Sequence, residues 1–161
     1  GYTNNPNDKG GETNWGITIA VAKANGYEGK MKELPLAMAK AIYKKEYWDK
    51  LKLDSVNNQV IAEIAFDIGV NAGVGVAAKM LQEMVNFMTT SNIEVDGKIG
   101  PKTLNKINDI KTKNDNEEAI LLLSILQGEH YLNCMRKREA NEVFSLGWLR
   151  RARSNIERSK L

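Results

Sequence analysis

The sequence predicts a mainly α-helical protein, and three observations carry this prediction. Apolar residues recur at helical spacing through most of the chain, whereas the alternation typical of strands is nearly absent. Residues that favour helix starts and helix ends bracket these apolar runs. The 161 residues are 42% hydrophobic and 27% charged, which suits one compact globular domain and excludes a disordered tail.

The N-terminal residues 1–14 are expected to form an irregular loop or a small hairpin. They are rich in Asn, Gly, Asp and Pro, which accept turn geometry. A short helix should follow, from the N-cap residue Thr18 to Gly26. Because Pro35 suits a first helical position, a second helix is expected over residues 35–51.

The longest apolar stretch covers residues 60–88 and predicts two helices, because it is too long for one strand. Gly69, Gly73 and Gly75 permit a break or a close approach of the backbone. We place the junction of the two helices between Asn71 and Gly75.

The rest of the chain predicts further helical segments. One helix should start at Pro101. A polar break is expected over residues 111–118, followed by a strongly apolar helix over residues 119–141. A final amphipathic segment closes the chain.

The composition excludes several functional classes. A single cysteine, Cys134, excludes an internal disulfide, and together with the single histidine, His130, it cannot build a structural zinc site. No apolar run approaches the roughly 20 residues that span a bilayer. We therefore expect no metal, no cofactor and no membrane span.

The net charge of +3 is unevenly placed, because the C-terminal residues 136–161 alone carry +5. With Trp148 beside the arginines, this basic end is compatible with a nucleic-acid surface, a solvated helix face or attraction to an anionic cell wall. The charge excess is too small to predict nucleic acid by itself. We expect no nucleic-acid partner.

The polar opening loop holds two neighbouring carboxylates, Asp8 and Glu12, followed by Asn14 and Trp15. Acid hydrolysis of a sugar needs one carboxyl group that donates a proton and a second that stabilises or attacks the cation. The same residues also suit an Asx-turn for Asp8 and plain surface charge for Glu12. A calcium loop is a third interpretation, although the spacing lacks the EF-hand pattern.

Two passages resemble the glycoside hydrolase family 108 muramidases. Residues 1–18, GYTNNPNDKGGETNWGIT, are similar to the family's E-G-G-Y followed by N-D-P-x-D-P-G-G-x-T-x-x-G-I-T. Residues 95–104, VDGKIGPKTL, are similar to the D-G-x-x-G-P-x-T signature of peptidoglycan-binding modules. The resemblance covers essentially the whole chain and implies a lysozyme-like fold. It implies a catalytic part over residues 1–75 and a peptidoglycan-binding part over residues 76–161, packed as one compact unit.

The resemblance also implies an activity, the cleavage of the bond between N-acetylmuramic acid and N-acetylglucosamine. The family's proton donor is the Glu of E-G-G-Y, which would lie two residues before Gly1, so the printed chain is expected to lack it. Asp8 matches the second carboxylate of phage-type lysozymes, and Glu12 is a further candidate. Asn14 stands where those enzymes have Thr, with Thr13 adjacent. The stereochemical course stays open.

The other expected site residues form two groups. The expected substrate-binding residues are Tyr2, Thr13, Asn14, Trp15 and Asn71. The expected peptidoglycan-binding segment includes Asp96, Gly97, Gly100 and Thr103.

The resemblance implies that peptidoglycan glycan chains are the partner of a monomeric enzyme. No export leader is visible near Gly1, so we expect synthesis in the bacterial cytoplasm and action on the wall in the periplasm or outside the cell. Release through a separate holin-like pore fits a phage endolysin. The second possible role is that of an enzyme linked to secretion in a Gram-negative bacterium. The alternative function is a non-catalytic peptidoglycan-binding protein of the same fold, which a residue without a carboxyl group two places before Gly1 would favour.

Overall fold

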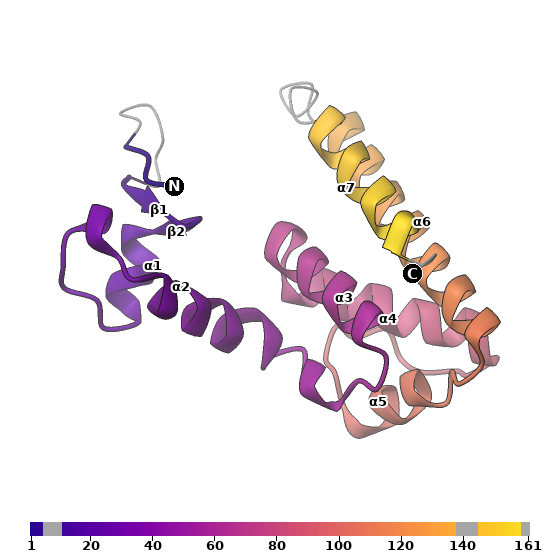
Figure 1. Ribbon diagram of the computed structural model, residues 1–161. Helices are drawn as coiled ribbons and strands as arrows, with labels where there is room; N and C mark the ends of the chain where they lie inside the picture. Colours follow the sequence, from indigo (N-terminus) through magenta and orange to yellow (C-terminus); the bar gives the residue numbers. More distant parts are fainter. Residues whose placement is uncertain (5–10, 138–144, 159–161) are drawn as a thin grey trace. The chain divides into compact units, whose positions relative to one another are not determined.

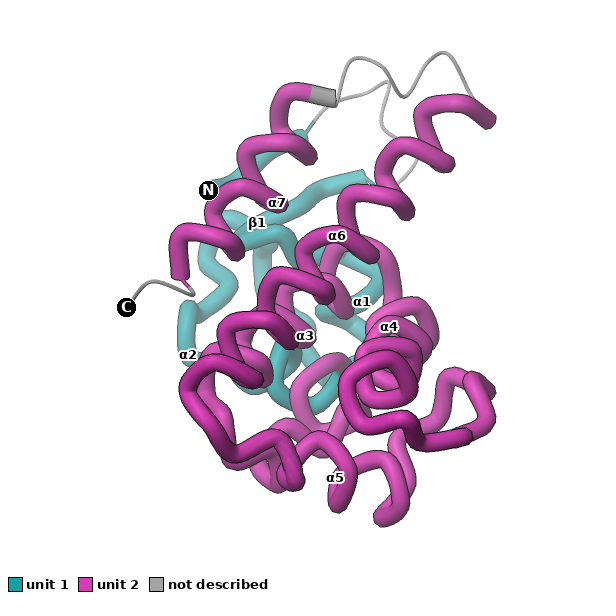
Figure 2. Tube along the Cα trace, turned by 90° about the vertical axis from the view of Figure 1, so that its right-hand side faces the viewer, with its two compact units in different colours: residues 1–46 teal, residues 47–161 magenta. Residues whose placement is uncertain are grey.

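The structure is a computed structural model of the chain and describes residues 1–4, 11–137 and 145–158. The chain divides into two compact units, residues 1–46 (unit 1) and residues 47–161 (unit 2), which Figure 2 shows in teal and magenta. Each unit has its own apolar core. Helices dominate both units and the described strands form only a small hairpin, which confirms the predicted mainly α-helical class.

Unit 1 contains a small hairpin close to the N-terminus, where the sequence analysis predicts either an irregular loop or a small hairpin. Strands β1 (Thr13–Asn14) and β2 (Ile17–Thr18) pair antiparallel. Trp15 and Gly16 join them with φ values of 52° and 76°, and positive φ at both positions is what a type I′ turn requires. Thr3 extends the pairing through two backbone hydrogen bonds with Thr13, of 2.8 and 2.9 Å.

Figure 1 shows helices α1 and α2 of unit 1, and both begin close to the predicted positions. Helix α1 (Ile19–Ala24) follows Thr18, whose side chain accepts a hydrogen bond from the backbone N–H of the first turn. Helix α2 (Leu36–Tyr43) has Pro35 at its N-cap, one position before the predicted place. A 3₁₀ turn, η1 (Met31–Glu33), lies between them.

The core of unit 1 is small and draws on β2, η1 and both helices. Its buried apolar residues are Ile17, Ala22, Met31, Leu34, Ala39 and Ile42. The partly buried residues packed against this core are Tyr2, Ile19, Tyr27, Met38 and Tyr43.

Unit 2 begins with short turns and then two packed helices. The π-helical turn η2 (Lys44–Trp48) follows α2 and spans the boundary between the two units in the sequence, and the 3₁₀ turn η3 (Leu53–Ser55) precedes α3 (Gln59–Ala72). Helix α4 (Val74–Thr89) follows after Gly73, whose φ of +100° favours glycine and ends α3. The predicted break between the two helices is therefore confirmed.

Two further helices start at defined signals, one of which the sequence analysis misread. Helix α5 (Pro101–Asn108) has its proline at the first helical position, as predicted. Helix α6 (Lys113–Lys137) begins inside the expected polar break, so that break is wrong. The Thr112 hydroxyl accepts a hydrogen bond from the backbone N–H of Asp115 at 3.1 Å and caps the helix. Asp115 lies in the first turn, where a negative charge is favourable, so this polar run is compatible with a helix.

Helix α7 (Ser145–Arg158) lies beside α6 in Figures 1 and 2 and packs along it. Residues 138–141, which were expected to end the apolar helix, lie outside the described residues. Within residues 1–4, 11–137 and 145–158, no helix combines the length and the apolar character needed to cross a membrane.

One large core holds unit 2 together. Its fully buried aliphatic residues include Leu51, Leu53, Ile61, Ile64, Ile68, Leu81, Met84, Ile107 and Leu123. Helices α3 and α4 share this core. The predicted boundary between the catalytic part and the peptidoglycan-binding part, between residues 75 and 76, therefore falls inside one core. The packing divides the chain between residues 46 and 47 instead, and the division between residues 75 and 76 stays a prediction from motifs.

Candidate functional site

The predicted catalytic loop leads into the hairpin of unit 1. Asp8 lies outside the described residues, and its role stays a prediction. The carboxylate of Glu12 lies near the hydroxyl of Tyr2. Burial, together with the adjacent Glu12 charge, raises the pKa of this hydroxyl. The ammonium group of Lys32 lies 5.1 Å from the centre of the Tyr2 ring, so a carboxylate and a cation hold this aromatic side chain.

Asn14 ties the hairpin to the turn η1. It is 4% exposed, and its Nδ2 donates to the backbone oxygens of Met31 at 2.7 Å and Lys32 at 3.3 Å. The neighbouring Thr13 pairs through its backbone with residues on both sides. The amide nitrogen of Asn14 therefore has a structural role, which is to join the hairpin to η1. The sequence analysis predicted only a substrate-binding role for this residue.

Trp15 presents an aromatic ring that is exposed and yet fixed. The side chain is 44% exposed, and its Nε1 donates to the backbone oxygen of Leu34 at 3.0 Å. The Tyr43 hydroxyl donates to the backbone oxygen of Trp15 at 3.1 Å, and a Cβ at Gly16 would collide with this hydroxyl. A fixed, half-exposed indole can stack on the apolar face of a sugar ring.

The structure brings some of the predicted residues together within unit 1, namely Tyr2, Glu12, Thr13, Asn14 and Trp15. Asn71 belongs to unit 2, on the last turn of α3. Its side-chain amide donates to the backbone oxygen of Asp67 at 2.6 Å and to Oδ1 of the same residue at 3.2 Å.

The predicted peptidoglycan-binding segment folds as a turn that is held by α4. Gln82 on α4 is 1% exposed, and its Nε2 donates to Asp96 Oδ1 at 2.8 Å and to the backbone oxygen of Lys98 at 3.0 Å. The backbone N–H of Gly97 donates to Gln82 Oε1 at 2.9 Å. The hydrogen bonds from Gln82 and from the Lys98 backbone lower the pKa of Asp96.

The two glycines and the threonine of this segment lie in the turn and at the start of helix α5. Gly97 has a φ of +77°, and a Cβ there would lie 3.2 Å from the backbone oxygen of Gly75. Gly100 is the N-cap of α5, and Thr103 is buried in its first turn. Asp96, Gly97 and Gly100 therefore shape the backbone of the segment, and Thr103 is buried beside it. The contact of these four residues with the wall stays a prediction.

Sequence reasoning missed Gln82, although one signal was present. Gln82 occupies a core-facing position of an otherwise apolar helical face, where a polar side chain needs internal partners. The sequence does not show that those partners lie 14 to 16 residues further along the chain.

Comparisons with known proteins agree with this structure. The sequence model of the family described as glycosyl hydrolase 108 matches residues 1–73, and that of a predicted peptidoglycan domain matches residues 76–153. The solved structure of Brucella abortus SagA is similar, with a TM-score of 0.74 and 28% identity over 99% of this chain and 85% of that chain. A search of curated proteins finds no match.

These findings confirm the resemblance seen in the sequence, and they support a glycoside hydrolase in general that acts on peptidoglycan. The order of the two matched segments is also the order that the sequence motifs predicted. Residues 1–73 of the chain thus resemble the glycosyl hydrolase 108 family, and residues 76–153 resemble a predicted peptidoglycan domain.

Proposed function

We propose that the protein is an N-acetylmuramidase that cleaves the β-1,4 bond between N-acetylmuramic acid and N-acetylglucosamine in glycan chains of peptidoglycan. The match of residues 1–73 to glycosyl hydrolase 108 is the observation that carries this function. The match of residues 76–153 to a predicted peptidoglycan domain supports the same polymer as the ligand. Two carboxyl groups and water supply all the chemistry that such a hydrolysis needs.

The two carboxyl groups need different environments to take different roles. We assign the proton donor to a Glu two residues before Gly1, because the resembling family carries its donor there. A carboxyl group against apolar residues keeps its proton near neutral pH. Asp8 lies in a polar, Gly-rich stretch of sequence that favours the ionised form, and it would stabilise the developing cation or attack it.

Glu12 takes a supporting role in this proposal. Its negative charge lies near the Tyr2 hydroxyl, so we assign it to holding that ring. Tyr2 and the half-exposed Trp15 then provide aromatic surfaces against which sugar rings can pack.

We propose that the protein is made in the cytoplasm and acts on the wall in the periplasm or outside the cell, as a monomer. Two routes fit this proposal, an endolysin released through a holin-like pore and an enzyme linked to a secretion system. Expression with and without a holin separates them: lysis only when the holin is present supports the endolysin, and lysis that is independent of the holin contradicts it.

The experiment that tests catalysis measures reducing sugar released from purified sacculi by the natural full-length protein. Replacing the Glu two places before Gly1 by Gln should lower the rate by at least about a hundredfold, because the general acid is lost. The matched control is Glu28→Gln, which neutralises an exposed carboxylate of unit 1 and should leave the rate unchanged. Unchanged hydrolysis in the first variant would contradict the donor assignment. Binding of sacculi without any hydrolysis by the natural protein would instead make it a wall-binding protein.

A further inference from the structure

A polar pocket of unit 2 lies between α3 and α7, away from the segment that carries the peptidoglycan signature. Its volume is about 280 Å³. Asp67 of α3 contributes to its lining, and α7 contributes Gly147, Arg150, Arg151, Ser154 and Arg158. Pockets that enclose drug-sized ligands measure roughly 300 to 1,000 Å³, so this pocket suits a single amino-acid-sized group rather than a disaccharide.

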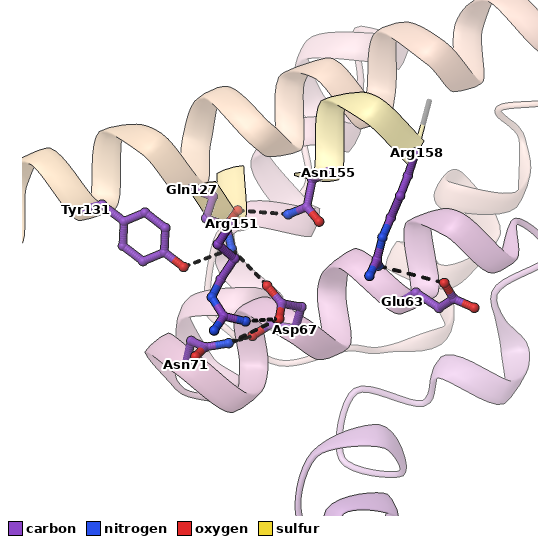
Figure 3. A network of polar contacts seen from close by, with 8 residues as sticks. All are labelled: Glu63, Asp67, Asn71, Gln127, Tyr131, Arg151, Asn155 and Arg158. Carbon is purple, nitrogen blue, oxygen red and sulfur yellow. Dashed lines mark hydrogen bonds and ion pairs between the residues drawn. The ribbon is translucent and has the colours of Figure 1, made fainter. Parts of the chain in front are cut away.

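The floor of this α3/α7 pocket is a buried polar network (Figure 3). Asn155 Nδ2 donates to Gln127 Oε1 at 2.9 Å, and both side chains are almost fully buried, at 2% and 1% exposure. Gln127 Nε2 in turn contacts the Tyr131 hydroxyl at 3.1 Å and Asp67 Oδ2 at 3.4 Å. The Tyr131 ring stacks on Trp148 with ring centres 5.1 Å apart. The polar groups behind the pocket are therefore fixed before any ligand binds.

The pocket keeps an excess of positive charge. Asp67 is the acidic residue in its lining, and its oxygens already accept hydrogen bonds from Arg151, Asn71 and Gln127. Arg158 lies 3.8 Å from Glu63, a half-exposed pair that holds little energy. Within the described part of the chain, Arg150 has neither an ion pair nor a hydrogen bond.

We propose that the α3/α7 pocket binds a free carboxylate of the peptide stem of peptidoglycan, an inference that rests on the proposed function. A guanidinium group matches a carboxylate with two parallel hydrogen bonds, and the Ser154 hydroxyl, one helical turn after Arg150, adds another donor. The sugar rings present neutral hydroxyl and acetamido groups, whereas the stems carry free carboxylates. A positive pocket of this size therefore distinguishes the stem from the sugar chain.

In the first test, the 161-residue chain is titrated with a soluble stem pentapeptide, and calorimetry measures the binding. The same peptide with every carboxylate converted to an amide should bind at least about tenfold more weakly, since it loses the charge-assisted hydrogen bonds. Inorganic phosphate should not displace the peptide at equal concentration. Equal binding of the amidated peptide would overturn the proposal, and so would tighter binding of phosphate, which would assign the pocket to phosphate-bearing polymers.

A pair of variants on one helix separates the pocket from general charge. Arg150→Gln removes a pocket guanidinium and should weaken binding of the pentapeptide at least about tenfold. Arg153→Gln removes the same charge outside the pocket, where the arginine is 80% exposed and pairs with Glu157. Binding by this control should stay within about twofold of the wild type. Equal losses in both variants would overturn the proposal, because non-specific attraction would explain them.

Hydrolysis of peptide-free glycan strands by the natural full-length protein keeps the two hypotheses apart. Strands that are cleaved, with no binding of the pentapeptide, would support the muramidase and overturn the stem site. Strands left intact, with carboxylate-dependent binding of the pentapeptide, would contradict the muramidase and support the stem site.

Discussion

Unit 1 and unit 2 hold their structures by different means. Unit 1 has a small apolar core, and Asn14, Trp15 and Tyr43 each donate a side-chain hydrogen bond to a backbone oxygen. Unit 2 has an apolar core drawn from several helices, and its buried polar residues Gln82 and Gln127 bond mainly to other side chains or to one turn. Small units bury too little apolar surface to rely on it alone.

This difference teaches where each kind of substitution should act. The region matched to the hydrolase family is shaped by polar contacts around a hairpin, so loss of one donor should loosen it locally. The helical unit should resist such changes and respond to cavities in its core instead. The following predictions test this contrast, from the largest effect to the smallest.

The largest expected effect is chemical rather than structural. Asp8→Ala in the natural full-length protein should lower the rate of glycan hydrolysis by about 10² to 10⁴, because the second carboxylate of the reaction is lost. Thermal unfolding should stay within a few degrees of the wild type. The exposed Glu28→Gln substitution is the control, and comparable rates in both variants would remove Asp8 from the mechanism.

A cavity in the core of unit 2 should give the largest loss of stability. Leu81 is 1% exposed, so Leu81→Ala should lower the free energy of unfolding by about 2 to 5 kcal/mol. Leu121 on α6 is 38% exposed, and Leu121→Ala should change the free energy of unfolding far less. Urea unfolding measures both variants, and similar losses would contradict the assignment of the core.

Loss of one amide should loosen unit 1 without unfolding unit 2. Asn14→Ala removes the donor to the Met31 and Lys32 oxygens, which costs about 1 to 3 kcal/mol. Hydrogen exchange should speed up at hairpin amides and stay unchanged in α3 and α4. Asn105→Ala, at an exposed position of α5, is the matched control and should change neither. Uniform acceleration across both units after Asn14→Ala would contradict the contrast between them.

The two glycines of the peptidoglycan signature should respond differently. Gly97→Ala places a side chain at a φ of +77° and near the Gly75 oxygen, which costs about 1 to 2 kcal/mol. At Gly100, φ is −107° and a Cβ would meet no atom within 4 Å, so Gly100→Ala should cost less than Gly97→Ala and lose only the preference of an N-cap for Gly over Ala. Thermal unfolding compares the two variants, and equal destabilisation would show that the signature does not act through this turn.

The smallest effect concerns one buried phenol at high pH. Burial, with Asp67 nearby, raises the pKa of Tyr131 from 10.0 to about 12. As the pH rises, the Tyr131 hydroxyl loses its proton at a lower pH in the unfolded chain than in the folded chain. The contribution of the protonated hydroxyl to stability is therefore complete below pH 10 and is lost as the pH rises towards 12. Tyr131→Phe should therefore flatten the fall in the urea midpoint between pH 9 and pH 11. An unchanged slope would contradict the raised pKa.

The sequence predicted those features of the fold that depend on neighbouring residues. Thr18 as an N-cap, Gly73 as a helix break and Pro101 as a first helical residue all hold in the structure. The predicted start of α6 was wrong, because a polar run that usually forms a loop can also form a helix when its first turn is capped. Local chemistry therefore predicted the helix starts that have a clear signal, and it missed the start of α6, whose first turn is polar.

The site was predicted less completely, because its contacts join residues that are distant in the chain. Arg151 bonds to Asp67 across 84 residues, and Asn14 bonds to Met31 across 17. No local pattern shows such partners. The polar opening loop supplied Glu12 and Trp15 as candidates, and Tyr2 was added alongside the resemblance. The holding roles of Gln82 and Asn155 came only from the structure.

The most direct measurement for the central claim is mass spectrometry of fragments released from purified peptidoglycan by the natural full-length protein. A hydrolytic muramidase leaves reducing N-acetylmuramic acid at the new end of each fragment. The account predicts these ends, and it predicts their loss in the Asp8→Ala variant. Reducing N-acetylglucosamine ends, or no release while the wall stays bound, would contradict it.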